Sequence, residues 1–177
     1  MKDRIECIAS HIVFTLKYSR YDYQRIKRIN PKGYVATTLP YFDDKEEDAI
    51  IEELCNVAGE LKLELIAFNF CGDHVHCIVC SERESLSKMM LLWKGKTSYN
   101  YNRRINLSSK GSSARIKSTY PQGLWAKSFY QKVLRNETEL CNAINYVVTN
   151  RKKHGLKPLS QKSSQLIRNA TRHNEKI

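Results

Sequence analysis

The 177-residue sequence predicts an α+β fold of the ferredoxin-like, split βαβ type, an antiparallel sheet with helices on one face. The first observation behind this prediction is the order of the elements. Strand-like and helix-like segments follow one another as β-α-β-β-α-β, and a further helix comes after them. The second is composition: hydrophobic residues make up 41% of the chain and charged residues 27%, which suits one domain with a buried core.

The first strand and the first helix are expected on either side of a long loop. Residues 9–18 alternate in polarity and are rich in β-branched and aromatic residues, as strands are. Residues 19–42 contain scattered proline and glycine and predict a loop. Asp43 and Asp44 are typical of a helix start, because carboxylates cap the free N–H groups, and we expect this helix to reach about Gly59.

A hairpin and a second helix follow. Residues 62–70 and 74–80 have strand composition, and the short segment between them predicts a hairpin. Ser85 is expected to cap a helix over residues 86–104. Residues 107–123 are rich in Ser, Gly and basic side chains and predict a mobile loop.

The C-terminal third is expected to complete the fold. Residues 125–134 have strand composition, and Asn136 is expected to cap a helix over about 137–154. We therefore expect one domain over residues 1–157. Residues 158–177 are polar and basic and predict a tail that is partly disordered.

The positive charge is concentrated in two segments. The net charge of the whole chain is +12, while residues 83–135 carry +11 and residues 151–177 carry +7. These two segments contain only two acidic side chains, so a solvated surface is a weaker explanation than a polyanionic partner. Nucleic acid is the first candidate.

Membrane insertion and secretion are not expected. No apolar run approaches the roughly 20 residues that span a bilayer, and the N-terminus lacks the features of a signal peptide. We expect a cytoplasmic protein associated with the nucleoid, with its six cysteines as thiols.

The most informative segment for chemistry is 73–80. In a strand His74 and His76 share one face, and two imidazoles at this spacing can bind one metal ion. The alternative is a pair of strand histidines that are only exposed or hydrogen-bonded. Cys77 and Cys80 resemble a zinc or redox pair, but residues three apart in a strand point to opposite faces, which argues against it.

The last predicted helix supplies further candidates. At 100° per residue, Tyr146 and Asn150 lie one turn apart at the edge of its apolar face and should border a cleft. A tyrosine can act as a nucleophile and an asparagine oxygen can bind a metal. A tyrosine packed at the rim of the core, with its hydroxyl in water, is the alternative.

Four stretches of the sequence together carry a resemblance. They comprise residues 10–20, the Asp-His-Val-His segment 73–76, residues 124–135, and residues 144–150 followed by 154–156. In this order and spacing the chain resembles the IS200/IS605-type single-tyrosine (HUH) transposases, near their REP-associated tyrosine transposase relatives.

The resemblance implies a ferredoxin-like catalytic domain and a homodimer. It also implies a divalent metal, Mg²⁺ or Mn²⁺, held by His74, His76 and Asn150. Tyr146 would be the nucleophile that cleaves single-stranded, hairpin-containing DNA, leaving a 5′-phosphotyrosine and a free 3′-OH for strand transfer or rejoining. In many members the tyrosine helix of one subunit completes the active site of the other.

Basic and aromatic side chains near these motifs are expected to bind DNA, because basic groups neutralise phosphates and aromatic rings stack on unpaired bases. The expected nucleic-acid contacts are Lys94, Lys96, Tyr99, Arg103, Arg104, Arg151, Lys152 and Lys153. Tyr101 is a second stacking candidate, whereas Trp93 is expected in the core.

Two other functions remain open from the sequence. One is a non-catalytic or domesticated protein of the same fold that binds single-stranded or hairpin nucleic acid. The other is a replication initiator or relaxase, which the short chain disfavours.

Overall fold

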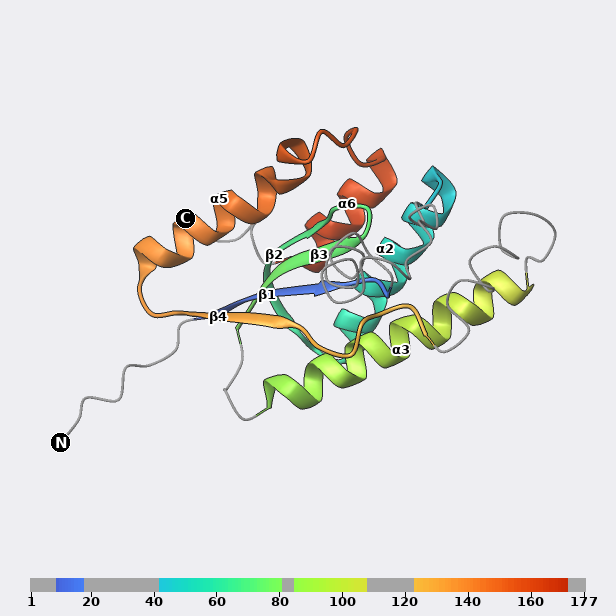
Figure 1. Cartoon of the computed structure of the whole chain (residues 1–177), viewed down its shortest axis with the longest axis horizontal. Coiled ribbons are helices and arrows are strands. Elements are labelled where there is room, and N and C mark those ends of the chain that lie inside the picture. The colour runs from blue at the N-terminus through green and yellow to red at the C-terminus, as the bar shows by residue number, and fades with distance from the viewer. Residues whose placement is uncertain (1–8, 18–41, 81–84, 108–122, 172–177) are drawn as a thin grey trace, which may run out of the picture.

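A four-stranded antiparallel sheet in the order β2-β3-β1-β4 forms the centre of the structure (Figure 1). The computed structural model describes residues 9–17, 42–80, 85–107 and 123–171. The strands are β1 (Ala9–Thr15), β2 (Glu64–Phe70), β3 (His74–Cys80) and β4 (Tyr130–Leu134). The predicted α+β fold with an antiparallel sheet is confirmed.

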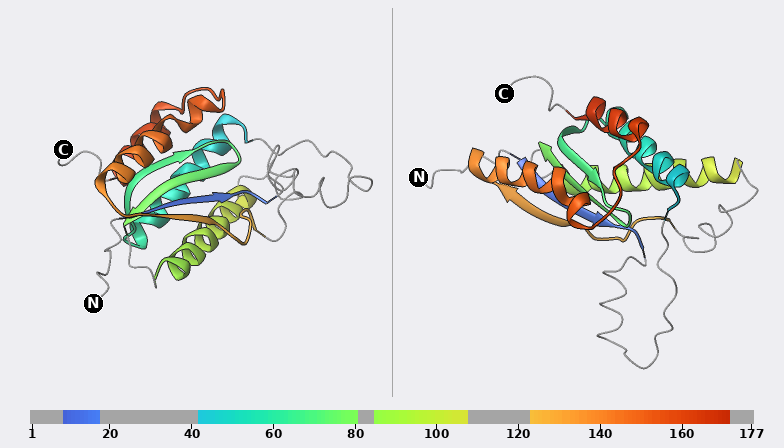
Figure 2. Two further views of the ribbon diagram at one scale, coloured as in Figure 1. Left: turned by 60° about the vertical axis from the view of Figure 1, so that its left-hand side comes forward. Right: turned by 90° about the horizontal axis from the view of Figure 1, so that it is seen from above.

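The helices cover both faces of the sheet (Figures 1 and 2). Helices α2 (Asp44–Glu60) and α3 (Leu86–Leu107) pack against each other on one face, where the larger core cluster lies. Helix α5 (Glu137–Lys153) lies on the opposite face, along β2 and β3. The sequence predicted helices on one face and an added helix, and the structure assigns that added helix its own face.

Alternation within the two central strands separates the face of the large apolar core from a face that carries histidines. Ile12 and Phe14 of β1 and Cys77 of β3 belong to the large core under α2 and α3. Their neighbours in sequence point to α5, where β1 presents His11 and β3 presents His74 and His76. The face that receives α5 therefore carries three imidazoles beside a smaller apolar cluster that includes Ile78 of β3 and Val147 of α5.

Helix α2 begins as its sequence indicates. Asp43 is the N-cap and accepts a hydrogen bond from the backbone N–H of Glu46, whose carboxylate accepts one from the N–H of Asp43. The buried face of the helix comprises Ile50, Ile51, Leu54, Cys55, Val57 and Ala58. The indole of Trp93, fully buried as expected, donates to the carbonyl of Leu54 and joins α3 to this helix.

Strand β4 is shorter than predicted, since it begins at Tyr130 and not at residue 125. Trp125 forms only an isolated bridge with Leu16. The ammonium of Lys94 accounts for part of the interruption, because it donates to the carbonyls of Lys127 and Ser128. The predicted loops 19–42 and 107–123 lie almost wholly outside the described residues.

The predicted tail contains a helix. Residues Gln161–Ala170 form α6, which packs against α2 and begins at Ser160, whose side chain accepts from the N–H of Ser163. The fully buried Ser163 donates to the carboxylate of Asp48. The expectation of disorder was therefore wrong for this segment, because α2 supplies the partner surface that the polar sequence does not reveal.

None of the described helices combines the length and apolarity that crossing a bilayer requires. The described cysteines, Cys55, Cys71, Cys77, Cys80 and Cys141, are free thiols. Cys77 is fully buried in the core whereas Cys80, three residues on, is partly exposed, as the alternation of the strand predicts.

Candidate active site

Four imidazole rings lie in a row beneath α5. They belong to His11 of β1, His76 and His74 of β3, and His154 at the C-cap of α5. Successive ring centroids, from His11 through His76 and His74 to His154, are 5.3, 4.9 and 5.0 Å apart. The row contains every histidine of the described residues.

The register of the sheet produces this row. His76 lies opposite Val13 of β1, so His11 is two positions along on the same face. His74 and His76 share that face by alternation, as predicted. All three strand histidines are buried, because α5 covers them.

Each histidine of the His74–His76 pair has a partner on its Nδ1 atom. His74 Nδ1 lies 2.7 Å from Asp73 Oδ1, and His76 Nδ1 lies 3.1 Å from His11 Nε2. Both rings therefore use Nδ1 for a local hydrogen bond, which makes Nε2 the nitrogen that remains for a metal ion.

Burial keeps two of these imidazoles neutral. The pKa of His76 is lowered to about 3 by burial and, next, by the nearby His74, His11 and His154. The pKa of His11 is also lowered, by burial and by the charge of Lys132. Neutral imidazole is the form that binds a metal ion.

Helix α5 presents Tyr146 and Asn150 to the strand histidines. These two residues and the C-cap His154 are spaced by four and so lie on one side of the helix. The ring of Tyr146 lies edge-on to the rings of His76 and His11, with centroid distances of 5.4 and 5.8 Å. Tyr146 is 42% exposed, which is the rim position that its place on the helix predicts.

Asn150 is more deeply placed than expected, with only 1% of its surface exposed. Its Oδ1 accepts a hydrogen bond from Cys71 Sγ at 3.4 Å. The amide of Asn69 donates to the carbonyls of Val147 and Val148, which ties the middle of α5 to β2. A carbonyl oxygen has two lone pairs, so the Cys71 contact leaves Asn150 Oδ1 able to accept a second bond.

The donors His74 Nε2, His76 Nε2 and Asn150 Oδ1 fit a divalent cation of the Mg²⁺ or Mn²⁺ class in kind, since nitrogen and neutral oxygen are both ligands of such ions. Within the described residues no group of three or more His, Cys, Asp or Glu side chains is arranged to hold a metal. A metal on these residues would therefore need Asn150, water or a substrate phosphate to complete its coordination.

The sequence analysis did not identify four residues that contact the candidate site: His11, His154, Asn69 and Cys71. The alternation of residues 9–18 was a usable signal for His11, because it assigns Ile12 and Phe14 to one face and His11 to the other. Asn69 and Cys71 had no such signal, since their contacts depend on how α5 docks.

Three expected DNA contacts follow one another at the end of α5 and differ in exposure. Lys152 and Lys153 are exposed, and the Nζ atom of Lys153 lies 4.5 Å from the ring centroid of Tyr146. Arg151 is buried and forms an ion pair with Glu47. Its guanidinium also donates to the carbonyl of Phe70 at 2.9 Å, so its donors bind groups of the protein itself.

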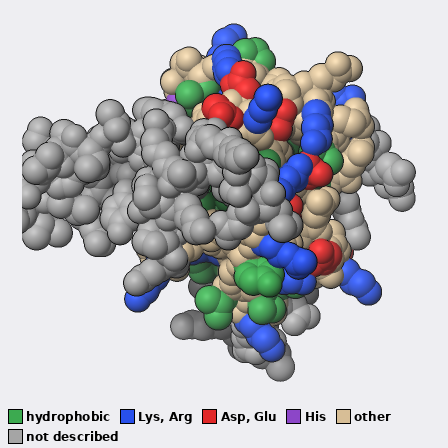
Figure 3. Space-filling model, turned by 90° about the vertical axis from the view of Figure 1, so that its right-hand side faces the viewer, with side chains coloured by type: hydrophobic (Ala, Val, Ile, Leu, Met, Phe, Trp, Pro, Cys, Tyr) green, Lys and Arg blue, Asp and Glu red, His purple; other side chains and the backbone are tan. Residues whose placement is uncertain are grey.

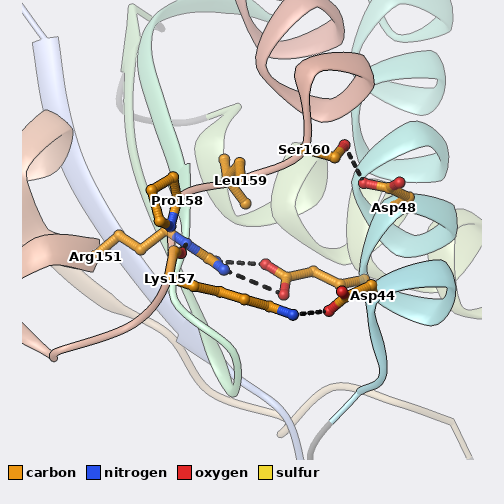
Figure 4. A pocket seen from close by; sticks show the side chains of 8 residues that line it. Asp44, Asp48, Arg151, Lys157, Pro158, Leu159 and Ser160 are labelled. Carbon is orange, nitrogen blue, oxygen red and sulfur yellow. Dashed lines mark hydrogen bonds and ion pairs between the residues drawn. The ribbon is translucent and has the colours of Figure 1, made fainter.

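Figure 4 shows Arg151 in a small cavity of about 130 Å³ where the segment after α5 crosses the start of α2. Beside it Lys157 pairs with Asp44, and the Ser160 hydroxyl donates to Asp48. Both cations of the lining pair with carboxylates, and the third carboxylate, Asp48, accepts hydrogen bonds from Ser160 and Ser163. These contacts join the segment after α5 and the start of α6 to α2.

The expected DNA contacts on α3 also differ in burial. Lys94 is buried, and burial lowers its pKa to about 8. It borders a pocket of about 500 Å³ together with Lys17, Lys127, Trp125 and others. This pocket lies between α3 and the segment before β4.

The remaining basic residues of α3 lie on the surface. Lys96 pairs with Glu60, Arg104 pairs with Glu52, and Arg103 is exposed. Figure 3 shows Lys and Arg side chains close to Asp and Glu side chains over one face of the molecule. Part of the positive charge is therefore balanced within the fold.

The two stacking candidates on α3, Tyr99 and Tyr101, differ in how far their rings are exposed. Tyr99 is 66% exposed, as a stacking residue must be. Tyr101 is fully buried in the core and lies edge-on to Phe42, with ring centroids 5.8 Å apart. The expectation that Tyr101 stacks on bases is therefore wrong for this structure, because its ring is part of the core.

Comparison with known proteins provides the context for this site. A family model described as "Transposase IS200 like" matches residues 38–150. A solved structure described as a REP-associated tyrosine transposase bound to a REP hairpin aligns with a TM-score of 0.49 and 14% identity, over 89% of this chain and 76% of that chain. A structure described as a transposase candidate from Deinococcus radiodurans R1 aligns with a TM-score of 0.47 and 17% identity, over 85% of this chain and 95% of that one. No curated protein sequence matches this chain.

Proposed function

This chain belongs to the family of IS200-like transposases, and from that premise we propose that it cuts and rejoins single-stranded DNA with Tyr146 as the nucleophile. The observation that carries the proposal is the position of Tyr146. Its ring is at the rim of the domain, partly exposed, and lies against His76 and His11 within the same chain. A nucleophile must reach a bulky phosphodiester, and this tyrosine is accessible while its ring is held.

In the proposed step the phenolic oxygen of Tyr146 attacks the phosphorus of one DNA phosphodiester. The bond from phosphorus to the 3′-oxygen breaks, and the proton lost by the tyrosine is balanced by the one that the 3′-oxygen gains. The products are a 5′-phosphotyrosine and a free 3′-OH. The reverse reaction on a second 3′-OH transfers or rejoins the strand without an external energy source, because the covalent bond conserves the energy of the cleaved one.

Residues of this chain orient the tyrosine. The hydrogen bonds from Asn69 to Val147 and Val148 hold α5 against β2, and the edge contacts with His76 and His11 restrict the phenol ring. The ammonium of Lys153, over the ring, favours the negative charge that develops on the tyrosine oxygen.

We propose that His74, His76 and Asn150 hold a divalent metal, Mg²⁺ or Mn²⁺. When bound, such an ion supplies Lewis-acid stabilisation of the charge on the non-bridging phosphate oxygens. The support is chemical: His74 and His76 each use Nδ1 for a local hydrogen bond, and Asn150 Oδ1 is held by Cys71 on the same side of the sheet.

The DNA surface that we propose is smaller than the set expected from sequence. It keeps the exposed Lys152 and Lys153 beside Tyr146. On α3 it keeps the exposed Lys96, Tyr99, Arg103 and Arg104. Lys94 is left out because it is buried and its Nζ donates to the carbonyls of Lys127 and Ser128. Arg151 is left out because its guanidinium is buried in protein contacts. A hairpin in the DNA and a homodimer remain predictions.

The proposal is tested by mixing the protein with labelled single-stranded oligonucleotides taken from the DNA that flanks its own gene, with Mg²⁺ or Mn²⁺. A covalent protein–DNA adduct on denaturing gels, absent without metal and absent in Tyr146→Phe, is the expected result. Binding without an adduct, across both metals and with hairpin substrates, would instead support a non-catalytic nucleic-acid binding protein.

A further inference from the structure

We propose that His11 is a positioning residue that fixes the tautomer and orientation of His76, and through the same ring restrains Tyr146. This inference deepens the proposed function and rests on it. It begins from one contact, the 3.1 Å distance between His11 Nε2 and His76 Nδ1, both buried beneath α5.

The contact has a defined direction if His76 is to bind a metal through Nε2. In neutral imidazole one nitrogen carries the proton and the other a lone pair. His76 must then carry its proton on Nδ1 and donate it to His11 Nε2. His11 in turn carries its own proton on Nδ1. The hydrogen bond therefore holds His76 in the tautomer with an Nε2 lone pair.

The neighbouring histidine shows the same arrangement with a different partner. His74 Nδ1 lies 2.7 Å from the carboxylate of Asp73, which can only accept. Each member of the His74–His76 pair thus has its own Nδ1 acceptor: a carboxylate beside His74 in sequence, and an imidazole from another strand for His76. Such partners of ligating histidines fix ring orientation and raise ligand basicity.

Packing gives His11 a second contact. Its ring lies beside the ring of His76, with centroids 5.3 Å apart and planes inclined by 25°, and it lies edge-on to Tyr146 at 5.8 Å. The backbone of β1 sets this position, because His11 lies between Ile78 of β3 and Lys132 of β4 in the ladder. One ring therefore touches both the proposed ligand and the proposed nucleophile.

Two substitutions separate the hydrogen bond from the packing. His11→Phe keeps an aromatic ring beside His76 and Tyr146 but removes the acceptor. His11→Gln removes the ring but can return an acceptor near the place of Nε2. Thermal unfolding of both variants shows that each is folded before it is compared.

The first measurement is long-range ¹H–¹⁵N NMR of His76 in the metal-free protein. We expect protonated Nδ1 and unprotonated Nε2 in the wild type and in His11→Gln, and loss of that single tautomer in His11→Phe. The second is Mn²⁺ affinity by titration calorimetry and electron paramagnetic resonance. We expect a loss of about 10- to 100-fold for His11→Phe and a smaller loss for His11→Gln. Tyr130→Phe, at an exposed tyrosine of β4 outside the proposed site, is the matched control and should keep the Mn²⁺ affinity of the wild type.

An unchanged His76 tautomer and unchanged Mn²⁺ affinity in His11→Phe would overturn the inference. Equal losses in His11→Phe and His11→Gln would also overturn it, since the acceptor would then not be what matters. If the wild type binds no Mn²⁺, the metal-dependent function fails. The tautomer measurement still decides whether His11 positions His76, so the two failures are distinguishable.

Discussion

The phenol ring of Tyr146 lies edge-on to the imidazole of His76, with ring centroids 5.4 Å apart and planes inclined by 80°. One residue belongs to α5 and the other to β3, so the contact exists only because α5 docks on the face of the sheet that carries the histidines. A single chain thus brings together the proposed nucleophile and the proposed metal ligands. The following predictions test what each part of this arrangement does.

Replacement of Tyr146 by Phe should abolish the covalent DNA adduct and leave the folded state almost unchanged. The hydroxyl supplies the attacking oxygen, whereas the ring contacts with His76 and His11 are kept. Denaturing gels with a labelled oligonucleotide measure the adduct. Tyr130→Phe is the control, because Tyr130 is an exposed tyrosine of β4 and should form the adduct as the wild type does. An adduct that persists in Tyr146→Phe would exclude Tyr146 as the nucleophile.

Replacement of Asn150 by Ala should lower Mn²⁺ affinity at least about tenfold, since the loss of a group that only supports a ligand already costs about 10- to 100-fold. The cost in stability should be only about 1 kcal/mol, because the one hydrogen bond lost is to the Cys71 thiol. Titration calorimetry and urea unfolding measure the two effects. Asn145→Ala, an exposed position on the same helix, should change neither. Equal metal affinity in Asn150→Ala and the wild type would remove Asn150 from the ligand set.

Replacement of Arg151 by Met should destabilise the protein by about 3 kcal/mol, because it leaves the carboxylate of Glu47 and the carbonyl of Phe70 without their partner in the interior. DNA affinity should keep its dependence on salt concentration. Lys152→Met gives the contrast: this exposed side chain should contribute to that dependence, reducing the slope by about 1 with little effect on stability. A reduced slope and unchanged stability in Arg151→Met would make Arg151 a phosphate contact after all.

Tyr99 and Tyr101 should respond in opposite ways to replacement by Ala. Tyr99→Ala should weaken single-stranded DNA binding by about 1–3 kcal/mol, the value of one stacked base, and leave stability unchanged. Tyr101→Ala should destabilise the fold by about 3–5 kcal/mol, since it removes a fully buried aromatic ring. Filter binding and urea unfolding separate the two outcomes. A stable Tyr101→Ala protein with weakened DNA binding would contradict the buried position.

Burial of Lys94 predicts a dependence of stability on pH. Its pKa is about 8 in the folded protein, against an ordinary value of 10.5. Between these values the unfolded chain binds more protons than the folded one, so the free energy of unfolding rises with pH. The uncharged amine still has two N–H donors for the carbonyls of Lys127 and Ser128.

The measurement compares the wild type with Lys94→Met. All other titratable groups are the same in the two proteins, so their contributions cancel in the difference. The difference in unfolding free energy, wild type minus variant, should rise by up to about 3 kcal/mol from pH 8 to pH 10.5, because one pKa unit corresponds to about 1.4 kcal/mol. Lys96→Met controls for loss of a surface lysine. A difference that stays constant or falls over this range would show that Lys94 is not buried as described.

Local sequence signals were sufficient for most elements. Asp43 was expected to start a helix and does so with Glu46, and residues 74–80 were expected to form the strand that the structure contains. The shared face of His74 and His76 and the rim position of Tyr146 also followed from the periods of strand and helix. These predictions held because capping and alternation depend on neighbours in the chain.

Features that depend on a distant partner were missed or wrong. Residues 158–177 were expected to form a partly disordered tail, and α6 within them was missed because its burial depends on the surface that α2 provides. Arg151 was expected on the DNA surface, yet Glu47 and Phe70 enclose its guanidinium. Tyr101 was expected to stack on bases, and the core around Phe42 contains it instead.

The sequence by itself therefore determined the antiparallel α+β fold, the two histidines on one face of a strand and the tyrosine at the edge of a helix. Only the tertiary structure decided that α5 docks over those histidines and that His11 joins them from β1. It also decided which cations are exposed and which are buried. The physical reason is that periodicity assigns a side chain to a face, whereas contact between two faces depends on the packing of the whole chain.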